Sequence, residues 1–373
     1  MKKQVVRTGA KGGGRDVRAV ILGGGRGTRF WPLGRAAKPK QFLRITGRDP
    51  MLLETVRRIR PFIPAKRTYV VADAVQTRLA RKLLPGLAAA NFIVEPLARN
   101  TAPALLLATA RVWLENPRAV VAVLPADHLV REPRQFLQTL RAGVEAAARE
   151  GALVIFGIPP ASPATGYGYI RHDRESGRRV GGTVFYPVTA FKEKPNLAQA
   201  DEYLASGDYA WNSGMFVWRA DVFAEKLETY APELRPAWSG ILEALKSGNR
   251  KNLRAAFALA PALSIDYALM EKAQGVLVAD ADFGWSDVGA WSTLLEVWPR
   301  DRNGNAVRGE VMTLDSRGCL VWNPGRLTVL VGVRNIVVVE AGDALLVCDT
   351  AHDQRLKDVV ESLKKTRKYL KYV

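Results

Sequence analysis

The segment Ala19–Leu33, with the sequence AVILGGGRGTRFWPL, decides the fold of this chain. Its first four residues form a short apolar run that predicts a buried strand. The glycines that follow predict a tight turn whose backbone N–H groups can surround an anion. Arg29 adds a planar, permanently charged guanidinium, and Lys40 adds an ammonium group further on. The segment therefore predicts a phosphate-binding loop at the end of a buried strand.

This loop differs from two common phosphate-binding motifs. A P-loop ends in Gly-Lys-Ser/Thr, whereas this chain has Gly27, Thr28 and Arg29 at that point. A dinucleotide-binding motif has a third glycine that opens a helix, whereas this chain has Pro32 there. The loop therefore indicates a nucleotide-binding site of another class.

The residues after the loop alternate between helical and strand-like patterns. We expect helices near 51–59, 74–84, 103–115 and 133–149, and strands near 69–72, 91–94, 119–124, 152–156, 184–192 and 214–218. The early strands are apolar throughout, which predicts an α/β domain whose mainly parallel sheet is covered on both faces. The later strands alternate with turns, so we expect the sheet to become mixed there. Ligands of such sheets bind beyond the carboxyl ends of the strands, where the loop, Glu95 and Asp127 should converge.

The pattern changes after residue 300 to short β segments separated by glycine and aspartate. This change predicts a second, all-β unit, for which the spacing permits either a short β-helix or a small sandwich. Apolar residues among the lysines at the end predict an amphipathic helix docked on a partner surface. We therefore expect a basic tail at 1–16, an α/β domain at 17–300 and a C-terminal β domain at 301–373.

The composition is that of an ordinary globular protein, with 373 residues, 48% hydrophobic and 24% charged. Two cysteines are too few for a disulfide scaffold or a cysteine zinc site. The net charge of +19 is spread along the chain without a nucleic-acid-binding motif, so we interpret it mainly as solvated charge. No apolar run reaches the roughly 18 residues of a membrane span, and the basic start lacks the apolar core of a signal peptide. We expect a cytoplasmic protein without a nucleic-acid or membrane partner.

The glycine-rich segment and the following Lys38–Leu43 resemble the signature of the sugar-nucleotide pyrophosphorylases, specifically the mannose-1-phosphate guanylyltransferases. Seven further segments match this family in its order: 95–103, 124–128, 166–170, 191–195, 211–216, 264–267 and 284–289. The resemblance covers roughly residues 17–350. It implies a Rossmann-like (GT-A-like) domain with a nucleotide half at about 17–157 and a sugar-phosphate half at about 158–300. It also implies a C-terminal β-helix-like domain used in homodimer formation, and a monofunctional form without an isomerase domain.

The reaction implied by the resemblance is the transfer of GMP from GTP to mannose 1-phosphate, giving GDP-mannose and pyrophosphate. The attacking phosphate oxygen is already anionic near neutral pH, because the second pKa of a phosphomonoester is roughly 6. The enzyme must therefore bring two anions together and stabilise the departing pyrophosphate, which requires cations. By resemblance, Arg29 and Lys40 hold the triphosphate and Lys194 binds the sugar phosphate.

A divalent cation, Mg²⁺, is implied as the cofactor that bridges the two phosphates, and it usually has carboxylate ligands. Asp127 follows a buried strand and Asp287 lies in a turn, so we expect these two aspartates to hold it. Asp287 could instead be an ordinary helix N-cap. His128 lies beside Asp127, but an isolated histidine is more often structural.

The remaining site residues follow from the resemblance. The expected nucleotide-binding residues are Leu22, Gly23, Gly24, Gly25, Gly27, Thr28, Glu95, Asn100 and Thr101. The expected sugar-phosphate-binding residues are Gly168, Glu193, Lys194, Asn212 and Asp266. The carboxylate of Glu95 can accept from guanine N1–H and the exocyclic amine, although a salt bridge or a helix cap would equally explain an acid there.

Other functions are compatible with the same residues. A related nucleotidyltransferase with another base or sugar, such as a uridylyl- or thymidylyltransferase acting on glucose 1-phosphate, would keep the fold and reaction type. A catalytically silent homologue that binds sugar nucleotides would keep the fold alone. A nucleic-acid-binding protein is supported only by the net charge.

Overall fold

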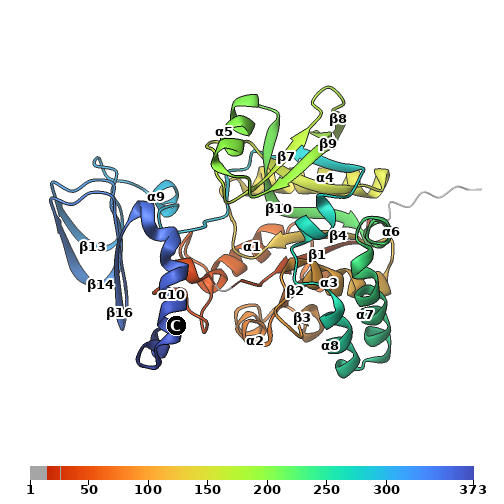
Figure 1. Cartoon of the computed structure of the whole chain (residues 1–373), viewed down its shortest axis with the longest axis horizontal. Coiled ribbons are helices and arrows are strands. Elements are labelled where there is room, and N and C mark those ends of the chain that lie inside the picture. The colour runs from red at the N-terminus through yellow and green to blue at the C-terminus, as the bar shows by residue number, and fades with distance from the viewer. Residues whose placement is uncertain (1–14, 26) are drawn as a thin grey trace, which may run out of the picture.

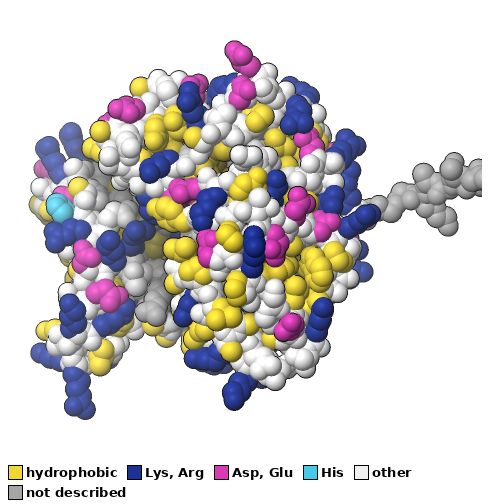
Figure 2. All heavy atoms as spheres, turned by 45° about the vertical axis from the view of Figure 1, so that its right-hand side comes forward, with side chains coloured by type: hydrophobic (Ala, Val, Ile, Leu, Met, Phe, Trp, Pro, Cys, Tyr) yellow, Lys and Arg dark blue, Asp and Glu magenta, His cyan; other side chains and the backbone are white. Residues whose placement is uncertain are grey.

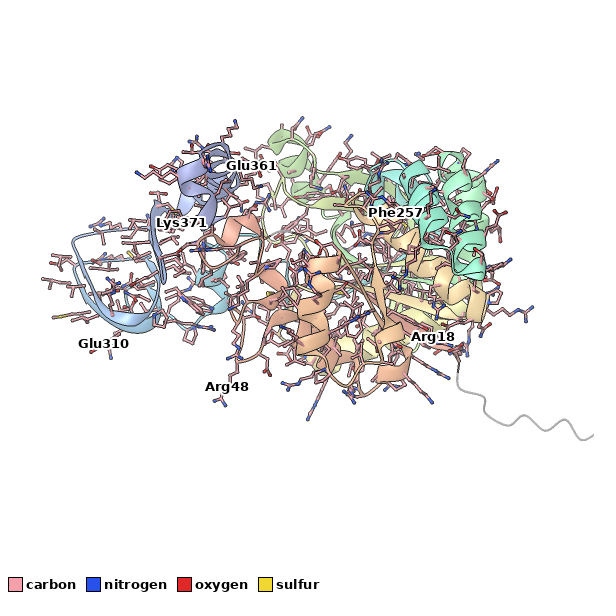
Figure 3. All side chains as sticks on the ribbon, turned by 90° about the horizontal axis from the view of Figure 1, so that it is seen from below. Arg18, Arg48, Phe257, Glu310, Glu361 and Lys371 are labelled. Atoms are coloured by element: carbon pink, nitrogen blue, oxygen red, sulfur yellow. The ribbon has the colours of Figure 1, made fainter. Side chains whose placement is uncertain are left out.

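The computed structural model describes residues 15–25 and 27–373. The predicted basic tail therefore lies almost wholly outside the described residues. Figure 1 shows a large α/β domain and, at its side, a separate unit of strands formed by the C-terminal part of the chain. Viewed from below, Arg18 and Phe257 lie in the large domain and Glu310 lies at the far end of the C-terminal unit (Figure 3).

The large domain is built on one ten-stranded sheet with the order β3-β2-β1-β4-β10-β6-β11-β9-β7, and β8 pairs with β9. Its strands are β1 (Val17–Leu22), β2 (Thr68–Ala72), β3 (Phe92–Val94), β4 (Val120–Pro125), β6 (Leu153–Ile158), β7 (Gly168–His172), β8 (Arg178–Val180), β9 (Thr183–Glu193), β10 (Tyr209–Arg219) and β11 (Val276–Asp280). The first four strands are parallel, whereas β10 runs antiparallel to both β4 and β6. The expectation of a mainly parallel sheet that becomes mixed is confirmed.

The strand order also explains where a ligand can bind. From β1 the chain moves outward to β2 and β3, and then returns to place β4 on the other side of β1. The strand order therefore continues in opposite directions from β1 and β4, which is the arrangement that opens a crevice at the carboxyl ends of strands in an α/β sheet.

Helices cover both faces of this sheet (Figure 1). They are α1 (Met51–Ile59), α2 (Ala74–Leu83), α3 (Thr101–Glu115), α4 (Pro133–Glu150), α5 (Leu197–Ser206), α6 (Ala220–Tyr230), α7 (Arg235–Ser247) and α8 (Arg250–Leu259). Successive strand residues point to opposite faces, so Val20 belongs to the core cluster beneath α3, whereas Ile21 belongs to the cluster beneath α4. None of the described helices is both long enough and apolar enough to span a bilayer.

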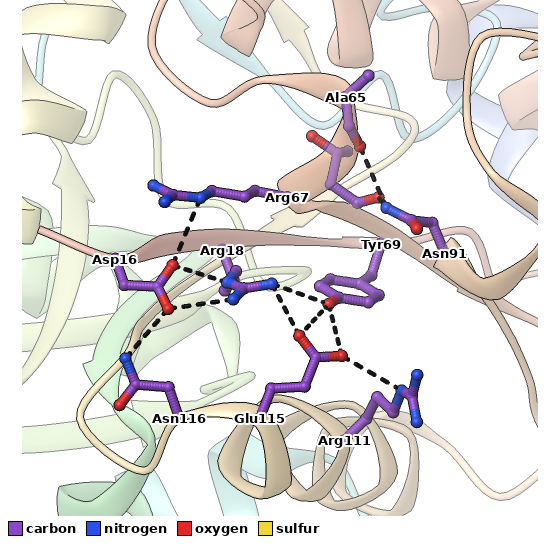
Figure 4. A network of polar contacts seen from close by, with 10 residues as sticks. Asp16, Arg18, Ala65, Arg67, Tyr69, Asn91, Arg111, Glu115 and Asn116 are labelled. Atoms are coloured by element: carbon purple, nitrogen blue, oxygen red, sulfur yellow. Dashed lines mark hydrogen bonds and ion pairs between the residues drawn. The ribbon is translucent and has the colours of Figure 1, made fainter.

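A polar network fixes the amino-terminal end of β1 (Figure 4). The guanidinium of Arg18 donates to Asp16 and Glu115, at 2.8 Å in each case, and Tyr69 donates to Glu115. The hydrogen bond from Arg18 is the main reason that the pKa of Asp16 is lowered. These groups lie at the strand end away from the crevice, so the network is structural.

The basic side chains elsewhere are dispersed. Figure 2 shows Lys and Arg spread over the visible face and interspersed with acidic and apolar side chains. This distribution agrees with solvated charge. Of the two cysteines, Cys319 is buried, whereas Cys348 is partly exposed.

The C-terminal unit contains β13 (Ala306–Leu314), β14 (Leu320–Val331), β15 (Ile336–Ala341) and β16 (Ala344–Asp349). The pairs β13–β14 and β14–β15 are parallel, and only β15–β16 is antiparallel. Successive parallel strands joined by short turns form the coil of a β-helix, which decides between the two alternatives left open by the sequence. Strand β14 continues through Gly325, so this glycine does not separate two short strands as the pattern predicted.

The predicted amphipathic helix is α10 (Leu356–Lys365), and it packs against η1 (Thr28–Phe30) in the glycine-rich loop. The indole of Trp31 donates to the carbonyl of Tyr372 at 2.8 Å, and the indole of Trp291 donates to the carbonyl of Trp31 at 3.1 Å. The partner surface of this helix is therefore the loop itself, so the C-terminal unit and the loop form one packed structure.

The β-helix depends on a close backbone approach at Gly309. This residue has φ +119°, and a Cβ added to it would collide with the carbonyl oxygen of Asn323. We expect Gly309→Ala to lower the free energy of unfolding by about 2–4 kcal/mol, measured by chemical denaturation. The matched control is Gly325→Ala, because no described atom lies within 4 Å of a Cβ added there. Equal stability of the two variants would contradict this account.

Candidate active site

A cleft of about 500 Å³ lies at the carboxyl ends of β1, β3 and β4. Eight of the residues predicted from the sequence line it: Leu22, Gly24, Gly25, Glu95, Asn100, Thr101, Asp127 and Asp266. The loop after β1, the segment after β3 and the segment after β4 therefore meet at one place, as the strand pattern indicated. Of the other predicted residues, Lys40 and Asn212 are hydrogen-bonded to the lining residues Asp127 and Asp266.

Two glutamines hold the glycine loop in shape. The amide of Gln41 donates to the carbonyl of Gly23, and the amide of Gln76 donates to the carbonyl of Gly25 at 2.9 Å. Within the described part of the chain, no acceptor pairs with the N–H groups of Gly24 or Gly25. These two N–H groups are therefore free for an anion.

The loop also packs closely against Lys40. Gly27 has φ +60°, and an added Cβ would lie 2.5 Å from the Cβ of Lys40. Glycine is thus required at this position for both reasons. Thr28 and Arg29 follow in η1, where Arg29 is exposed and makes no hydrogen bond or ion pair with a described residue.

Lys40 lies between the two predicted metal ligands. Its Nζ atom donates to Oδ2 of Asp127 at 2.9 Å and to the backbone carbonyl of Asp287. Burial alone would raise the pKa of Asp127, but Lys40 and His128 outweigh it and lower the pKa. Asp287 follows β12 (Trp285–Ser286) and is not a helix cap, because α9 (Leu294–Val297) begins later, after Thr293.

Tyr167 orients Asp287, a contact that the sequence did not reveal. The hydroxyl of Tyr167 donates to Oδ1 of Asp287 at 2.8 Å, and its ring packs on Trp211 and Trp285. Burial, followed by the charge of Asp287, raises the pKa of Tyr167, so the hydroxyl remains a donor. Nearby, His128 accepts a hydrogen bond from the indole of Trp285 at 3.1 Å, which agrees with a structural role.

Acidic and amide groups gather on the side of the cleft formed by the later strands. Asn212 donates to Oδ1 of Asp266 at 2.8 Å, and Oε2 of the buried Glu193 has no hydrogen-bond partner among the described residues. Burial, with a further contribution from Glu193, raises the pKa of Asp266 to about 6. A Cβ added at Gly168 would collide with Glu193, so glycine allows this approach. Lys194 pairs with Oε1 of Glu193, and its side chain is 57% exposed.

The opposite side of the cleft is formed by residues after β2 and β3. Glu95 makes neither a salt bridge nor a helix cap with the residues described, and burial followed by the charge of Asp73 raises its pKa to about 7. Asp73 and Gln76 at the start of α2 also line the cleft and were missed. The sequence contained a signal for Asp73, because it is an acidic residue directly after β2, just as Glu95 is an acidic residue directly after β3.

Asn100 and Thr101 have structural contacts of their own. Asn100 has φ +68°, and its side chain accepts from the N–H of Thr101 at the start of α3. The hydroxyl of Thr101 accepts from the N–H of Ile265 at 2.9 Å. Both residues therefore shape the amino-terminal end of α3, which faces the cleft and favours an anion there.

Comparison with known proteins agrees with this geometry. Residues 18–304 match the model of the nucleotidyl transferase family, and residues 309–363 match that of the MannoseP isomerase/GMP-like β-helix domain. A mannose-1-phosphate guanylyltransferase of Klebsiella pneumoniae is 38% identical over 94% of this chain and 74% of its own length. The chain belongs to the mannose-1-phosphate guanylyltransferases of the nucleotidyl transferase family.

Two further relatives place the chain within this guanylyltransferase family. Xanthan biosynthesis protein XanB of Xanthomonas campestris pv. campestris is 41% identical over 94% of this chain and 73% of its own length. A solved structure from Thermus thermophilus, named a mannose-1-phosphate geranyltransferase, has a TM-score of 0.84 and 35% identity, and the match covers 94% of this chain and 99% of that one. Both domains of this guanylyltransferase thus have close structural counterparts.

Asp127 and Asp287 would supply two carboxylates to a divalent cation that takes most of its ligands from outside the protein. In the described part of the chain, no group of three or more His, Cys, Asp or Glu side chains could hold a metal ion. Lys40 contacts the carboxylate of Asp127 and the backbone carbonyl of Asp287. Mg²⁺ is commonly bound by one or two carboxylates together with water and substrate phosphates, so these two aspartates would fit it.

Proposed function

We propose that this chain transfers GMP from GTP to mannose 1-phosphate, giving GDP-mannose and pyrophosphate. The observation that carries the proposal is the cluster of Lys40, Asp127 and Asp287, which reaches the cleft at Asp127, where Glu95 and Asp266 also line it. The guanylyltransferase relatives at 38% identity support the choice of these two substrates. GTP is made in the cytoplasm, and we place the reaction there.

The mechanism follows from electrostatics. A sugar-phosphate oxygen attacks the α-phosphate of GTP in line with the departing pyrophosphate, and no side chain needs to remove a proton from it. The free N–H groups of Gly24 and Gly25, with Arg29, hold the triphosphate in this proposal. The ammonium of Lys194 holds the sugar phosphate, and its pairing with Glu193 fixes it beside the sugar. Binding energy is therefore used to bring two anions into line.

The metal and sugar contacts complete the proposed site. Asp127 and Asp287 would hold Mg²⁺, which neutralises charge on the phosphates and acts as a Lewis acid when bound. Tyr167 keeps the carboxylate of Asp287 oriented through its hydrogen bond. The oxygens of Glu193 and Asp266 accept hydrogen bonds from mannose hydroxyls, and Asn212 can do the same.

The first test is pyrophosphate release with Mg²⁺, crossing GTP, ATP, UTP and dTTP against mannose 1-phosphate and glucose 1-phosphate. We expect the fastest turnover with GTP and mannose 1-phosphate, and a loss of about 100-fold or more in Asp127→Asn. Asp201→Asn removes an exposed carboxylate on α5 and should retain wild-type turnover. Faster turnover with another pair would change the assigned specificity, and no release with any pair would favour a silent homologue.

Base recognition by Glu95 predicts a pH dependence. Because its pKa is raised to about 7, the ionised form that accepts from guanine N1–H is lost as the pH falls below 7. We expect the KM for GTP to rise by up to about tenfold from pH 7.5 to 6. Glu95→Gln should have a higher KM for GTP with a flatter pH profile, and weaker discrimination against ATP. The Glu243→Gln control, at an exposed position of α7, should keep the wild-type profile. Parallel profiles for wild type and Glu95→Gln would exclude this role.

We also propose that the protein is a homodimer formed through the β-helix. Cross-strand pairs Met312–Val329 and Leu314–Val331 place four apolar side chains on one face, each more than half exposed. An apolar patch of this kind on a small domain favours a partner surface. We expect a dimer in analytical ultracentrifugation that Val329→Lys converts to monomer. Leu259→Lys, at an equally exposed site on α8, should remain dimeric; a monomeric wild type would refute the proposal.

A further inference from the structure

The side chain of Lys40 is unusually confined for a lysine. The residue is only 6% exposed, and it begins η2 (Lys40–Phe42) directly beneath the glycine loop. Gly27 packs on its Cβ, and the ring of Phe30 lies 5.8 Å from its Nζ atom. The position of the ammonium group is therefore set by packing, whereas most lysines keep this group in water.

The ammonium contacts both residues that are predicted to bind metal. It donates to a carboxylate oxygen of Asp127 and to the backbone carbonyl of Asp287. The other side of Asp287 is held by the hydroxyl of Tyr167. A single positive charge thus joins the segment after β4 to the segment after β12, and it contacts oxygen atoms that a hard cation would also use.

The protein alone provides few other ligands at this place. As noted above, the described residues contain no set of three or more metal-binding side chains. A hard divalent cation needs about six oxygen ligands, so water and substrate phosphates must supply the remainder. A metal that approached the nucleotide-free protein would also meet repulsion from Lys40.

We propose that Lys40 is a built-in counter-cation that keeps the Asp127–Asp287 site closed to divalent metal until the nucleotide binds. The triphosphate then offers the ammonium a new anionic partner, and Asp127 becomes available to metal that arrives with the nucleotide. Metal and GTP therefore enter together, and the free protein does not hold metal at this site. This inference rests on the metal role given to the two aspartates in the proposed function.

The test is the binding of Mn²⁺ to nucleotide-free protein, followed through the electron paramagnetic resonance signal of free Mn²⁺. Lys40→Gln keeps a donor for both oxygens but removes the charge. We expect it to bind Mn²⁺ about tenfold or more tightly than wild type, because the competing charge is gone. Adding Asp127→Asn to Lys40→Gln should abolish this gain. Lys66→Met removes an exposed charge at the opposite end of β2 and should bind Mn²⁺ like wild type. A Lys40→Gln variant that binds no more tightly than wild type would overturn the inference.

A second measurement does not require a Lys40 variant to fold. Asp127→Asn should leave Mn²⁺ binding unchanged in nucleotide-free protein, but should weaken it when GTP is present without sugar phosphate. If the nucleotide-free wild type binds Mn²⁺ at a site that Asp127→Asn removes, the site is open and the inference is wrong. Neither measurement needs turnover. A failure of the pyrophosphate assay is therefore distinguishable from a failure of this inference.

Discussion

The contact between Lys40 and Asp127 is the interaction on which the rest of the site depends. It joins the loop that follows β1 to the carboxyl end of β4, and through the carbonyl of Asp287 it includes the segment after β12. A buried carboxylate is costly unless it is paired. The ammonium removes this cost and at the same time fixes the spacing of three chain segments that are far apart in sequence. Gly27 is required because only glycine lets the loop approach this lysine.

The C-terminal unit also holds the glycine-rich loop in position by packing against it. Phe30 packs on the buried ring of Trp291 with centroids 5.1 Å apart, and Trp31 is hydrogen-bonded on one side to Trp291 and on the other to Tyr372. The glycine-rich loop is therefore held between the sheet below it and the C-terminal segments beside it. Stability of the β-helix and order of the loop are linked, because Phe30 of the loop shares one hydrophobic cluster with Leu320 and Val337 of the β-helix.

Much of the fold follows from the sequence, because apolar runs and helical spacing directly reflect burial. The parallel strands and the convergence of three segments at their carboxyl ends were predicted in this way. The direction of pairing in the C-terminal unit was not, because strands of equal spacing can pair either way. The partner of Lys40 was not predictable from spacing either, since it depends on how β1 and β4 lie in the sheet. The hydrogen bonds of Tyr167 and Gln76 were not predictable from the sequence either, because they also depend on how the strands lie in the sheet.

The acidic residues of the cleft differ in the direction of their pKa shifts, which depends on whether a cation lies beside them. Glu95 and Asp266 are half-buried without a cation in close contact, and desolvation raises their pKa values to about 7 and about 6. Asp127 is also half-buried, but Lys40 and His128 lower its pKa. A carboxylate whose negative charge is poorly compensated is stabilised most by hydrogen bonds from neutral donors such as ring N–H and hydroxyl groups. A carboxylate with a depressed pKa remains ionised and can exchange one cation for another. In the proposed function, the poorly compensated acids accept hydrogen bonds from the base and the sugar, and the paired Asp127 acts where the phosphate charge lies.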